Sequence, residues 1–307
     1  MSPTAPEVET MEIALLNVFS VVPFRRMTFP SYQRLLQTLT NVGPQVAYGA
    51  RVDGRPVGLA LAELDAADAS RASLLSVFVD HAHRGRGVAT ALVRAVQGHL
   101  AALGRDEVEA SFVGGGESTP ALRVVLARCG WGEPVATKWT GRGLVADMVR
   151  APFMRRFRLP TEFDVVPWVS LDAAQREQVA RLCDEGWAPP ALVPFRSEAC
   201  LDPVTSLALR HRGEVVGWGI NQILRPGVLT YACSYVHPRW LGRGHLIGVY
   251  VESIRRHHQL LPEHPRGTLV VPHEFPRMVE FARRHLGPHL QSTSEFVRAS
   301  VRLEHAA

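Results

Sequence analysis

Short apolar runs alternate with polar turns in the first third of the chain, and a helical pattern follows them. The segments QVAYGARVD, RPVGLALAELDA and RASLLSVFVD are apolar-rich and joined by short turns, which predicts consecutive antiparallel strands over residues 45–80. From Ala89 to Leu103 apolar residues recur at three- and four-residue steps, which predicts a helix that Gly104 ends. DEVEASFV is then predicted as a strand, TPALRVVLARCG as a helix, and PVATKWT and LVADMVR as closing strands.

The same order of elements occurs a second time. The segment from Tyr235 to His257 repeats the pattern of the segment from Phe78 to Leu100, and Gly87 and Gly244 lie 244 − 87 = 157 positions apart. The glycines of the later CGW and LGP sequences keep this offset, 287 − 130 = 157. Each copy begins with a predicted helix, SYQRLLQTL in the first and LDAAQREQVARLCDEGW in the second. A fixed offset between several markers indicates a duplicated domain.

These patterns predict an α+β fold of two domains, each a mixed, mostly antiparallel twisted sheet flanked by helices. The predicted boundaries are a first domain at residues 1–152, a linker at 153–162 and a second domain at 163–307. The sequence RAPFMRRFRLP around the linker mixes prolines and arginines, as linkers do. Its apolar residues are expected to pack on one domain; the alternative is a basic helix that contacts a membrane.

Composition and charge narrow the function classes. The 307 residues are 46% hydrophobic and 21% charged, and they include no apolar run as long as a membrane-spanning helix. The N-terminus lacks a secretory pattern, so we expect a cytoplasmic protein without a membrane partner. The 34 basic and 29 acidic residues give a net charge of +5, but the arginines are scattered, so no nucleic-acid partner is expected. The pattern carries no signal for oligomeric state.

No metal site is expected. The four cysteines form no CxxC pair, so neither a zinc knuckle nor a disulfide framework is indicated. The pairs His81 with His83 and His257 with His258 have no cysteine or aspartate at ligand spacing.

The sequence Arg84-Gly85-Arg86-Gly87 joins the last predicted strand of the first copy to a helix. A strand that enters a helix through such a turn leaves unpaired backbone N–H groups at the helix start, which bind anions. Glycine permits unusual φ values and close approach of a phosphate oxygen, and the two arginines add charge-assisted hydrogen bonds. We therefore predict a pyrophosphate site. Neither a dinucleotide fingerprint nor a P-loop is present, and FVGGGEST lacks the P-loop lysine and is interpreted as a flexible loop.

The order Arg-Gly-Arg-Gly-Val-Ala after several antiparallel strands resembles the acyl-CoA-binding motif of the GNAT superfamily of N-acetyltransferases. The resemblance covers nearly the whole chain, once per half, and implies a tandem GNAT protein. It implies that the turn binds the CoA pyrophosphate and that the preceding strand, residues 75–79, pairs with the pantetheine arm. The predicted binding residues are Val77, Phe78, Val79, Arg84, Gly85, Arg86, Gly87, Val88, Ala89 and Thr90.

The second copy departs from this motif. Leu241 stands where the first copy has Arg84, and Leu246 stands where it has Ala89. We expect the first domain to bind the donor and the second to shape the acceptor site or to hold the pair together. The segment from Asp184 to Trp187 either contacts a cationic acceptor or is a plain helix end and loop.

The resemblance also implies a carboxylate base on the fourth strand and a tyrosine acid on the second helix, but Leu75 and Leu126 stand at these positions. Three hypotheses remain. The base is Glu63 or Glu117; or solvent takes the protons while a backbone N–H of residues 77–79 polarises the carbonyl; or the protein binds acyl-CoA without turnover.

The predicted function is that of an acyl-CoA-dependent N-acyltransferase. It moves an acetyl or longer acyl group from CoA to a primary amine of a small metabolite, or to a lysine or ornithine side chain of a peptide. The amine attacks directly in a ternary complex, with acetyl-CoA or a longer acyl-CoA as co-substrate and no metal. The alternative is a non-catalytic acyl-CoA sensor or partner-binding module.

Overall fold

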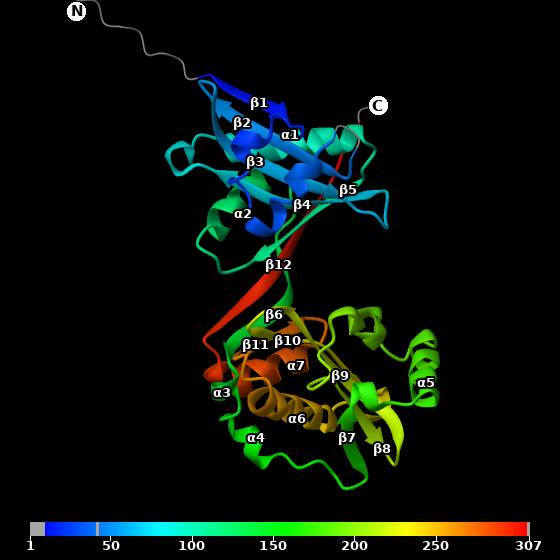
Figure 1. Cartoon of the computed structure of the whole chain (residues 1–307). Helices are drawn as coiled ribbons and strands as arrows, with labels where there is room; N and C mark the ends of the chain where they lie inside the picture. The colour runs from blue at the N-terminus through cyan, green and yellow to red at the C-terminus, as the bar shows by residue number, and fades with distance from the viewer. Residues whose placement is uncertain (1–9, 41–42, 306–307) are drawn as a thin grey trace, which may run out of the picture. The chain divides into compact units, whose positions relative to one another are not determined.

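The computed structural model describes residues 10–40 and 43–305, and its chain forms two compact units (Figure 1). Unit 1 comprises Met1–Ala136 and Phe296–Ala307, and unit 2 comprises Thr137–Glu295. Each unit has a mixed, mostly antiparallel sheet with helices against it, so the predicted α+β class is confirmed. Within the described residues, every helix is too short or too polar to span a lipid bilayer.

The sheet of unit 1 has the strand order β1-β2-β3-β4-β5-β12. Its strands are β1 (Met11–Leu15), β2 (Gln45–Val52), β3 (Arg55–Leu64), β4 (Arg71–Val79), β5 (Glu107–Val113) and β12 (Ser292–Arg302). The pair β4 and β5 is parallel, and the other pairs are antiparallel. The helices are α1 (Val88–Ala102), which links β4 to β5, and α2 (Thr119–Arg128), which follows β5.

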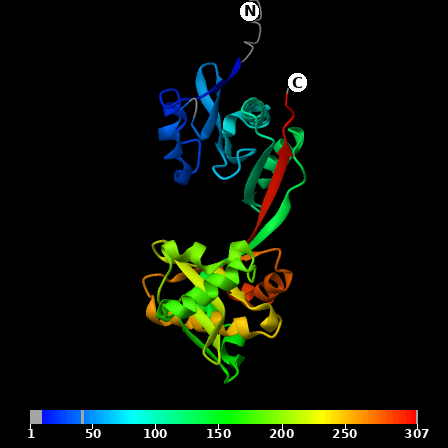
Figure 2. The same cartoon turned by 90° about the vertical axis from the view of Figure 1, so that its right-hand side faces the viewer.

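Apolar clusters cover both faces of this sheet. On one face α1 buries Leu92, Val93, Val96 and Leu100, as its periodicity predicts, against residues of β2 to β5. On the other face the short 3-10 turns within residues 22–38 pack Phe24 and Leu36 against Leu59 and Leu61 of β3. Figure 2 shows these blue turns and the cyan-green α1 on opposite sides of the strands.

The helix predicted for SYQRLLQTL is wrong. The structure has two separate 3-10 turns there, Pro30–Tyr32 and Leu35–Thr38. No side chain caps either turn, and each buries at most one residue. A segment this short has too few hydrogen bonds to offset the cost of helix nucleation.

The sheet of unit 2 has the strand order β6-β11-β10-β9-β8-β7. Its strands are β6 (Val135–Leu144), β7 (Phe163–Pro167), β8 (Leu207–His211), β9 (Glu214–Arg225), β10 (Val228–Val236) and β11 (Arg266–Pro272). Its helices are α3 (Val145–Met148), α4 (Pro152–Arg156), α5 (Ala173–Asp184), α6 (His245–Leu260) and α7 (Pro276–Phe281). As in unit 1, the strand before the long helix, β10, is parallel to the strand after it, β11.

The linker segment packs on unit 2. Met154 of α4 is 2% exposed and belongs to a cluster with Val251 and Ile254 of α6, so the expected packing of its apolar residues is confirmed. The strand predicted for LVADMVR is wrong, because residues 145–148 form α3. Val145 and Met148, three positions apart, both enter this cluster, which a helical turn allows and an alternating strand does not.

The strands that close the two sheets come from unexpected parts of the chain. β6 follows α2 but pairs with β11 in unit 2, through residues 138–144. The last strand, β12, pairs with β5 in unit 1, through residues 296–302. The units therefore differ from the sequence-based boundaries: residues 137–152 belong to unit 2 and residues 296–307 to unit 1.

Candidate functional site

The glycine turn before α1 has the conformation that the anion-site prediction requires. Gly85 and Gly87 have φ values of 78° and 83°, and Gly87 is the N-cap of α1. A Cβ at either position would have no protein atom within 4 Å. Glycine is thus required here by the positive φ, and the open space in front of the turn is available to a ligand.

Backbone donors are exposed at this turn. The first hydrogen bond of α1 joins the Ala91 N–H to the Gly87 carbonyl at 3.0 Å, so the N–H groups of Val88, Ala89 and Thr90 precede the helical ladder. Arg84 contributes in two ways. Its Nε donates to the Val79 carbonyl at 3.1 Å, which fixes the junction between β4 and the turn, while its exposed side chain keeps the guanidinium charge beside the turn.

The strands β4 and β5 separate before they reach the turn. They pair only at Arg71–Ser73 with Glu107–Glu109, and β5 then continues against β12. Within the described residues, Leu74 to Val79 therefore have no ladder partner on the β5 side, although β3 pairs with all of them except Leu75 on the other. Unpaired backbone groups on a strand edge can bind an extended ligand as an added strand does.

A β-bulge lies in the open part of β4. Leu61 pairs with Ser76 and Ala62 pairs with Leu74, so Leu75 is the extra residue. Leu75 and Ser76 both point to the face covered by residues 22–38: Leu75 packs on that cluster, and the Ser76 and Thr28 hydroxyls lie 2.7 Å apart. Bulges occur often beside active sites because they redirect side chains and leave backbone groups unpaired.

Comparison with known proteins identifies this arrangement. Residues 16–131 match the model of the acetyltransferase (GNAT) family. The match to the GNAT acetyltransferase domain is confined to these residues of unit 1, and the whole chain has the tandem GNAT fold. The open β4 edge, the bulge and the glycine turn all lie within the matched residues. A search of the curated proteins by sequence found no match.

Solved structures match nearly the entire chain. A tandem GNAT protein from the clavulanic acid biosynthesis pathway is 16% identical, with a TM-score of 0.59, over 97% of this chain and 100% of that one. A GCN5-related N-acetyltransferase from Sphaerobacter thermophilus is 16% identical, with a TM-score of 0.62, over 97% of both chains. The glucosamine N-acetyltransferase region of a fungal β-N-acetylglucosaminidase is 13% identical, with a TM-score of 0.63, over 97% of this chain and 39% of that one.

Glu63 lies on the bulged face, which is the face of the unit 1 sheet to which Leu75 and Ser76 of the bulge point. It pairs across the strands with Ser73, and it alternates with Leu59 and Leu61, which pack on the same face as Leu75. A residue in this diagonal relation to the bulge is about 7–8 Å from it. Gln45 donates to Glu63 Oε1 at 3.0 Å, and within the described chain no arginine or lysine forms an ion pair with this carboxylate.

Sequence reasoning missed a second carboxylate in the same row. Glu109 of β5 is level with Ser73, but Arg71 donates to it at 3.0 Å and Arg298 lies 3.8 Å from it. These partners neutralise Glu109 and make it a structural residue. The contact with Arg298 depends on β12, which no local pattern around residue 109 reveals.

Glu117 lies elsewhere. It is exposed in the turn after Val113, at the other end of β5 from Glu109. Val113 lies four positions along β5 from Glu109, which is level with Ser73 and Glu63, and four positions span about 13 Å. The structure therefore does not bring the two predicted carboxylates together.

The turn of unit 2 has the same backbone but a different surrounding. Gly242 and Gly244 have φ values of 77° and 80°, and the Ile247 N–H donates to the Gly244 carbonyl at 2.9 Å. This tight bond uses a donor near the start of α6. In addition, Arg277 Nη1 would lie 3.7 Å from a Cβ on Gly242.

Aromatic rings also occupy the start of α6. His245 stacks on Phe163 with ring centres 4.3 Å apart, and Trp240 meets both rings edge-on. Burial, together with the charge of Arg243, lowers the pKa of His245, so this imidazole is neutral at pH 7. The Arg243 guanidinium lies over the Trp240 ring, 5.6 Å from its centre. The residues that would hold a pyrophosphate thus contact one another instead.

Within residues 10–40 and 43–305, no group of three or more His, Cys, Asp or Glu side chains could hold a metal ion. His81 and His83 form a 3-10 turn capped by Asp80, whose side chain accepts from the Ala82 N–H at 3.1 Å. Leu126, at the position where the resemblance implies a tyrosine, is 1% exposed in the α1-side cluster.

Proposed function

We propose that unit 1 is an acyl-CoA-dependent N-acyltransferase that moves an acetyl or longer acyl group from CoA to a primary amine. The observation that carries this proposal is the continuity of the open β4 edge with the positive-φ turn at Gly85 and Gly87. An extended chain with amides at one end and a pyrophosphate at the other fits such a path, and this is the chemistry of the pantetheine arm of CoA.

The donor would bind along the residues predicted from the sequence. The amide groups of Val77 to Val79 would pair with the pantetheine arm, and the N–H groups at the start of α1 would hold the pyrophosphate. Arg84 would add a charge-assisted hydrogen bond. The thioester would then lie near the bulge, where an unpaired backbone N–H can stabilise the oxyanion that forms during attack.

The acceptor would approach over the bulged face, where Ser76, Thr28 and Glu63 lie. Its neutral nitrogen attacks the thioester carbon, the C–S bond breaks, and CoA leaves as the thiolate. Glu63 would take the amine proton, directly or through one water. Because Leu126 is buried and has no proton to give, the thiolate would be protonated by solvent.

The proposed acceptor is a small metabolite amine or a lysine or ornithine side chain of a peptide. The carboxylate of Glu63 without a cationic partner supports a cationic acceptor. Unit 2 would shape the acceptor site or stabilise the enzyme rather than bind a second CoA, because the Arg277 side chain lies beside its turn and His245 at the start of α6 stacks on Phe163.

The test combines binding with turnover. The purified full-length protein is titrated with CoA and with acyl-CoAs from acetyl to long-chain, and free thiol release is followed with and without pooled amines and basic peptides. Amine-dependent thiol release supports the transferase and identifies the acyl length. If no CoA binds, the proposal for the turn at residues 84–90 is wrong.

A non-catalytic acyl-CoA sensor is the second candidate. It is favoured by two leucines, because Leu75 at the bulge and Leu126 on α2 replace the two groups that the resemblance implies for proton transfer. This candidate predicts stabilisation by CoA without thiol release across a broad acceptor panel.

A further inference from the structure

A basic pocket lies in unit 2, away from that unit's own turn at Gly242 and Gly244. Its volume is about 340 Å³, within the range of small-ligand sites. It is lined by Val149, Met154, Arg155, Arg158, Arg255, His258 and Gln259. The α6 residues of the pocket begin at Arg255, and eleven helical positions from Gly244 to this residue correspond to about 16 Å along the axis.

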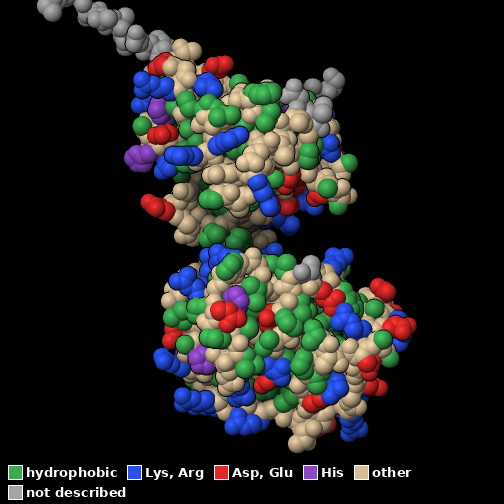
Figure 3. All heavy atoms as spheres, viewed as in Figure 1, with side chains coloured by type: hydrophobic (Ala, Val, Ile, Leu, Met, Phe, Trp, Pro, Cys, Tyr) green, Lys and Arg blue, Asp and Glu red, His purple; other side chains and the backbone are tan. Residues whose placement is uncertain are grey.

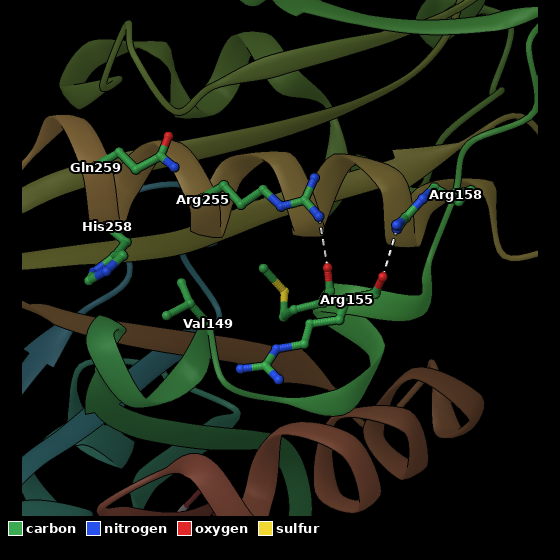
Figure 4. A pocket seen from close by; sticks show the side chains of 7 residues that line it. Val149, Arg155, Arg158, Arg255, His258 and Gln259 are labelled. Atoms are coloured by element: carbon green, nitrogen blue, oxygen red, sulfur yellow. Dashed lines mark hydrogen bonds between the residues drawn. The ribbon is translucent and has the colours of Figure 1, made fainter.

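Cationic side chains reach this pocket from two elements. Arg255 and His258 project from α6, and Arg155 and Arg158 come from α4 and the segment that follows it (Figure 4). Figure 3 shows basic side chains, in blue, gathered on the lower left of unit 2, where Figure 1 shows α4. Among the described residues, no aspartate or glutamate lines the pocket or pairs with its three arginines. Their mutual repulsion is therefore uncompensated within this part of the chain.

Two of the guanidinium groups are already held in place. Arg255 Nη2 donates to the Met154 carbonyl at 2.8 Å, and Arg158 Nη1 donates to the carbonyls of Arg155 at 2.7 Å and Phe157 at 2.8 Å. A guanidinium has five N–H donors, so several remain on each group. Side chains that are ordered before binding lose less entropy when a ligand binds.

The floor of the pocket is apolar. Met154 is 2% exposed and Val149 is half-buried. The three arginines are themselves exposed, so their attraction for an anion comes from their convergence on one pocket rather than from burial. Arginine forks match the oxygens of phosphate, and an imidazole adds another donor.

We propose that this pocket binds a small phosphate ester or diphosphate, as a second ligand site separate from the acyl-CoA turn. A nucleic acid backbone offers the same phosphate chemistry, but a pocket of about 340 Å³ matches a small molecule better than a long strand. The proposal does not depend on the acyltransferase function, because all seven lining residues belong to unit 2.

The chain offers a matched pair of variants. Arg155 and Arg156 are adjacent in α4 and both are exposed, but only Arg155 lines the pocket. Neither side chain has a partner within the described chain, so Arg155→Gln and Arg156→Gln each remove one charge without breaking an internal bond. If both variants lose the same affinity for pyrophosphate, the loss reflects the general positive charge of the surface. If only Arg155→Gln loses affinity, the loss reflects the pocket.

The experiment is calorimetric titration of the full-length protein with inorganic pyrophosphate, in a Gly87→Ala background in which a Cβ obstructs the turn at residues 84–90. We expect one remaining pyrophosphate site, whose Kd rises about tenfold or more in Arg155→Gln and less than twofold in Arg156→Gln. Absence of this site in the Gly87→Ala protein would overturn the proposal, whether or not the unsubstituted protein binds CoA.

Two further outcomes would also overturn it. An equal loss of pyrophosphate affinity in Arg155→Gln and Arg156→Gln would show that pyrophosphate is attracted nonspecifically to the basic surface. Tighter binding of a single-stranded oligonucleotide, with a steep salt dependence and sensitivity to Arg156→Gln, would identify a nucleic acid surface instead. A repeat of the titration with glycine retained at position 87 counts the turn separately, so failure at one site is distinguishable from failure at the other.

Discussion

Leu75 of unit 1 and Ala232 of unit 2 are each the extra residue of a β-bulge, and they lie 232 − 75 = 157 positions apart. In β10, Tyr231 pairs with Asn221 and Cys233 pairs with Ile220, which leaves Ala232 without an opposite residue. The offset is the same as that between the glycine turns. The duplication therefore preserved the backbone of the site, the bulge and the turn, in both units.

The two units differ in what surrounds this common backbone. In unit 1 the space in front of Gly85 and Gly87 is open, whereas in unit 2 Arg277 approaches Gly242 and His245 stacks on Phe163. The proposed donor site in unit 1 and the corresponding turn in unit 2 thus differ in their surrounding side chains and not in their main-chain conformation.

Substitution of Gly87 should separate ligand binding from stability. Gly87→Ala places a Cβ in the left-handed region, which lowers the free energy of unfolding by about 1 kcal/mol, and it obstructs the approach of a phosphate. Gly244→Ala is the matched control, since Gly244 has a φ of 80° against 83° for Gly87. We expect a similar loss of stability in both variants and a rise of roughly tenfold or more in the Kd of CoA only for Gly87→Ala. Calorimetric titration and denaturant unfolding measure the two effects; a weaker affinity in Gly244→Ala would assign the donor to unit 2.

The structure ranks the two candidate bases. Glu63 lies on the bulged face, diagonal to Leu75, whereas Glu117 is in an exposed turn beyond β5. If Glu63 accepts the amine proton, Glu63→Gln should lower kcat by roughly 10²–10⁴ with little change in the affinity for CoA. Glu117→Gln serves as the control and should leave kcat within twofold.

Steady-state thiol release under saturating acyl-CoA gives both values of kcat. If Glu63→Gln retains full kcat, solvent takes the proton and the backbone of β4 performs the remaining catalysis. If Glu117→Gln is the impaired variant, the turn after β5 must move toward the bulge during turnover.

Removal of the last strand should damage the domain that begins the chain. Truncation after Glu295 deletes the part of β12 that pairs with β5, including Val297 and Ala299, which are 5% and 2% exposed. The edge of β5 then loses its hydrogen-bond partners, and burial of the valine alone contributes about 1.5–3 kcal/mol. Amide hydrogen exchange should show loss of protection in β5 and weaker CoA binding. Truncation after Leu303 keeps the whole ladder and is the control; protection that survives the longer truncation would show that unit 1 folds without β12.

The sequence predicted local features of the fold well. The helix α1 and the strands β2 to β4 follow from apolar periodicity, and the duplication follows from glycine spacing, because both signals are local or repeat at a fixed offset. The positive φ values at Gly85 and Gly87 agree with the turn predicted from residue type alone.

The sequence pattern could not predict which strands pair when they are far apart in the chain. The strand β12 carries the same alternation whether it closes its own copy or the other one, so its pairing with β5 could not be predicted. For the same reason the ion pairs of Glu109 with Arg71 and Arg298 had no signal, and neither did the hydroxyl contact of Ser76 with Thr28. The resemblance assigns the position of the family carboxylate to Leu75, and the strand register shows that Leu75 is the extra residue of a bulge.

Acid should destabilise unit 2 through His257. This imidazole is fully buried; its Nε2 donates to the His264 carbonyl at 2.6 Å, and its Nδ1 accepts from the Tyr231 hydroxyl at 2.9 Å. Burial has the largest effect and lowers the pKa of His257. The hydrogen bond to the His264 carbonyl and the charge of Asp202 raise this pKa, and the charges of His264 and His258 lower it further.

The sign of the effect follows from proton binding. The unfolded chain binds a proton at His257 near its ordinary pKa of about 6.5, whereas the folded chain binds it only at lower pH. Above this value the group contributes no pH dependence, and below it the free energy of unfolding falls by up to about 1.4 kcal/mol per pH unit until the folded pKa is reached. Five of the six tryptophans lie in unit 2, so fluorescence-detected denaturant unfolding reports mainly on this unit. We expect His257→Gln to flatten the decline below pH 6.5, and His258→Gln, an exposed neighbour, to keep it; an unchanged slope in His257→Gln would assign the acid sensitivity to another group.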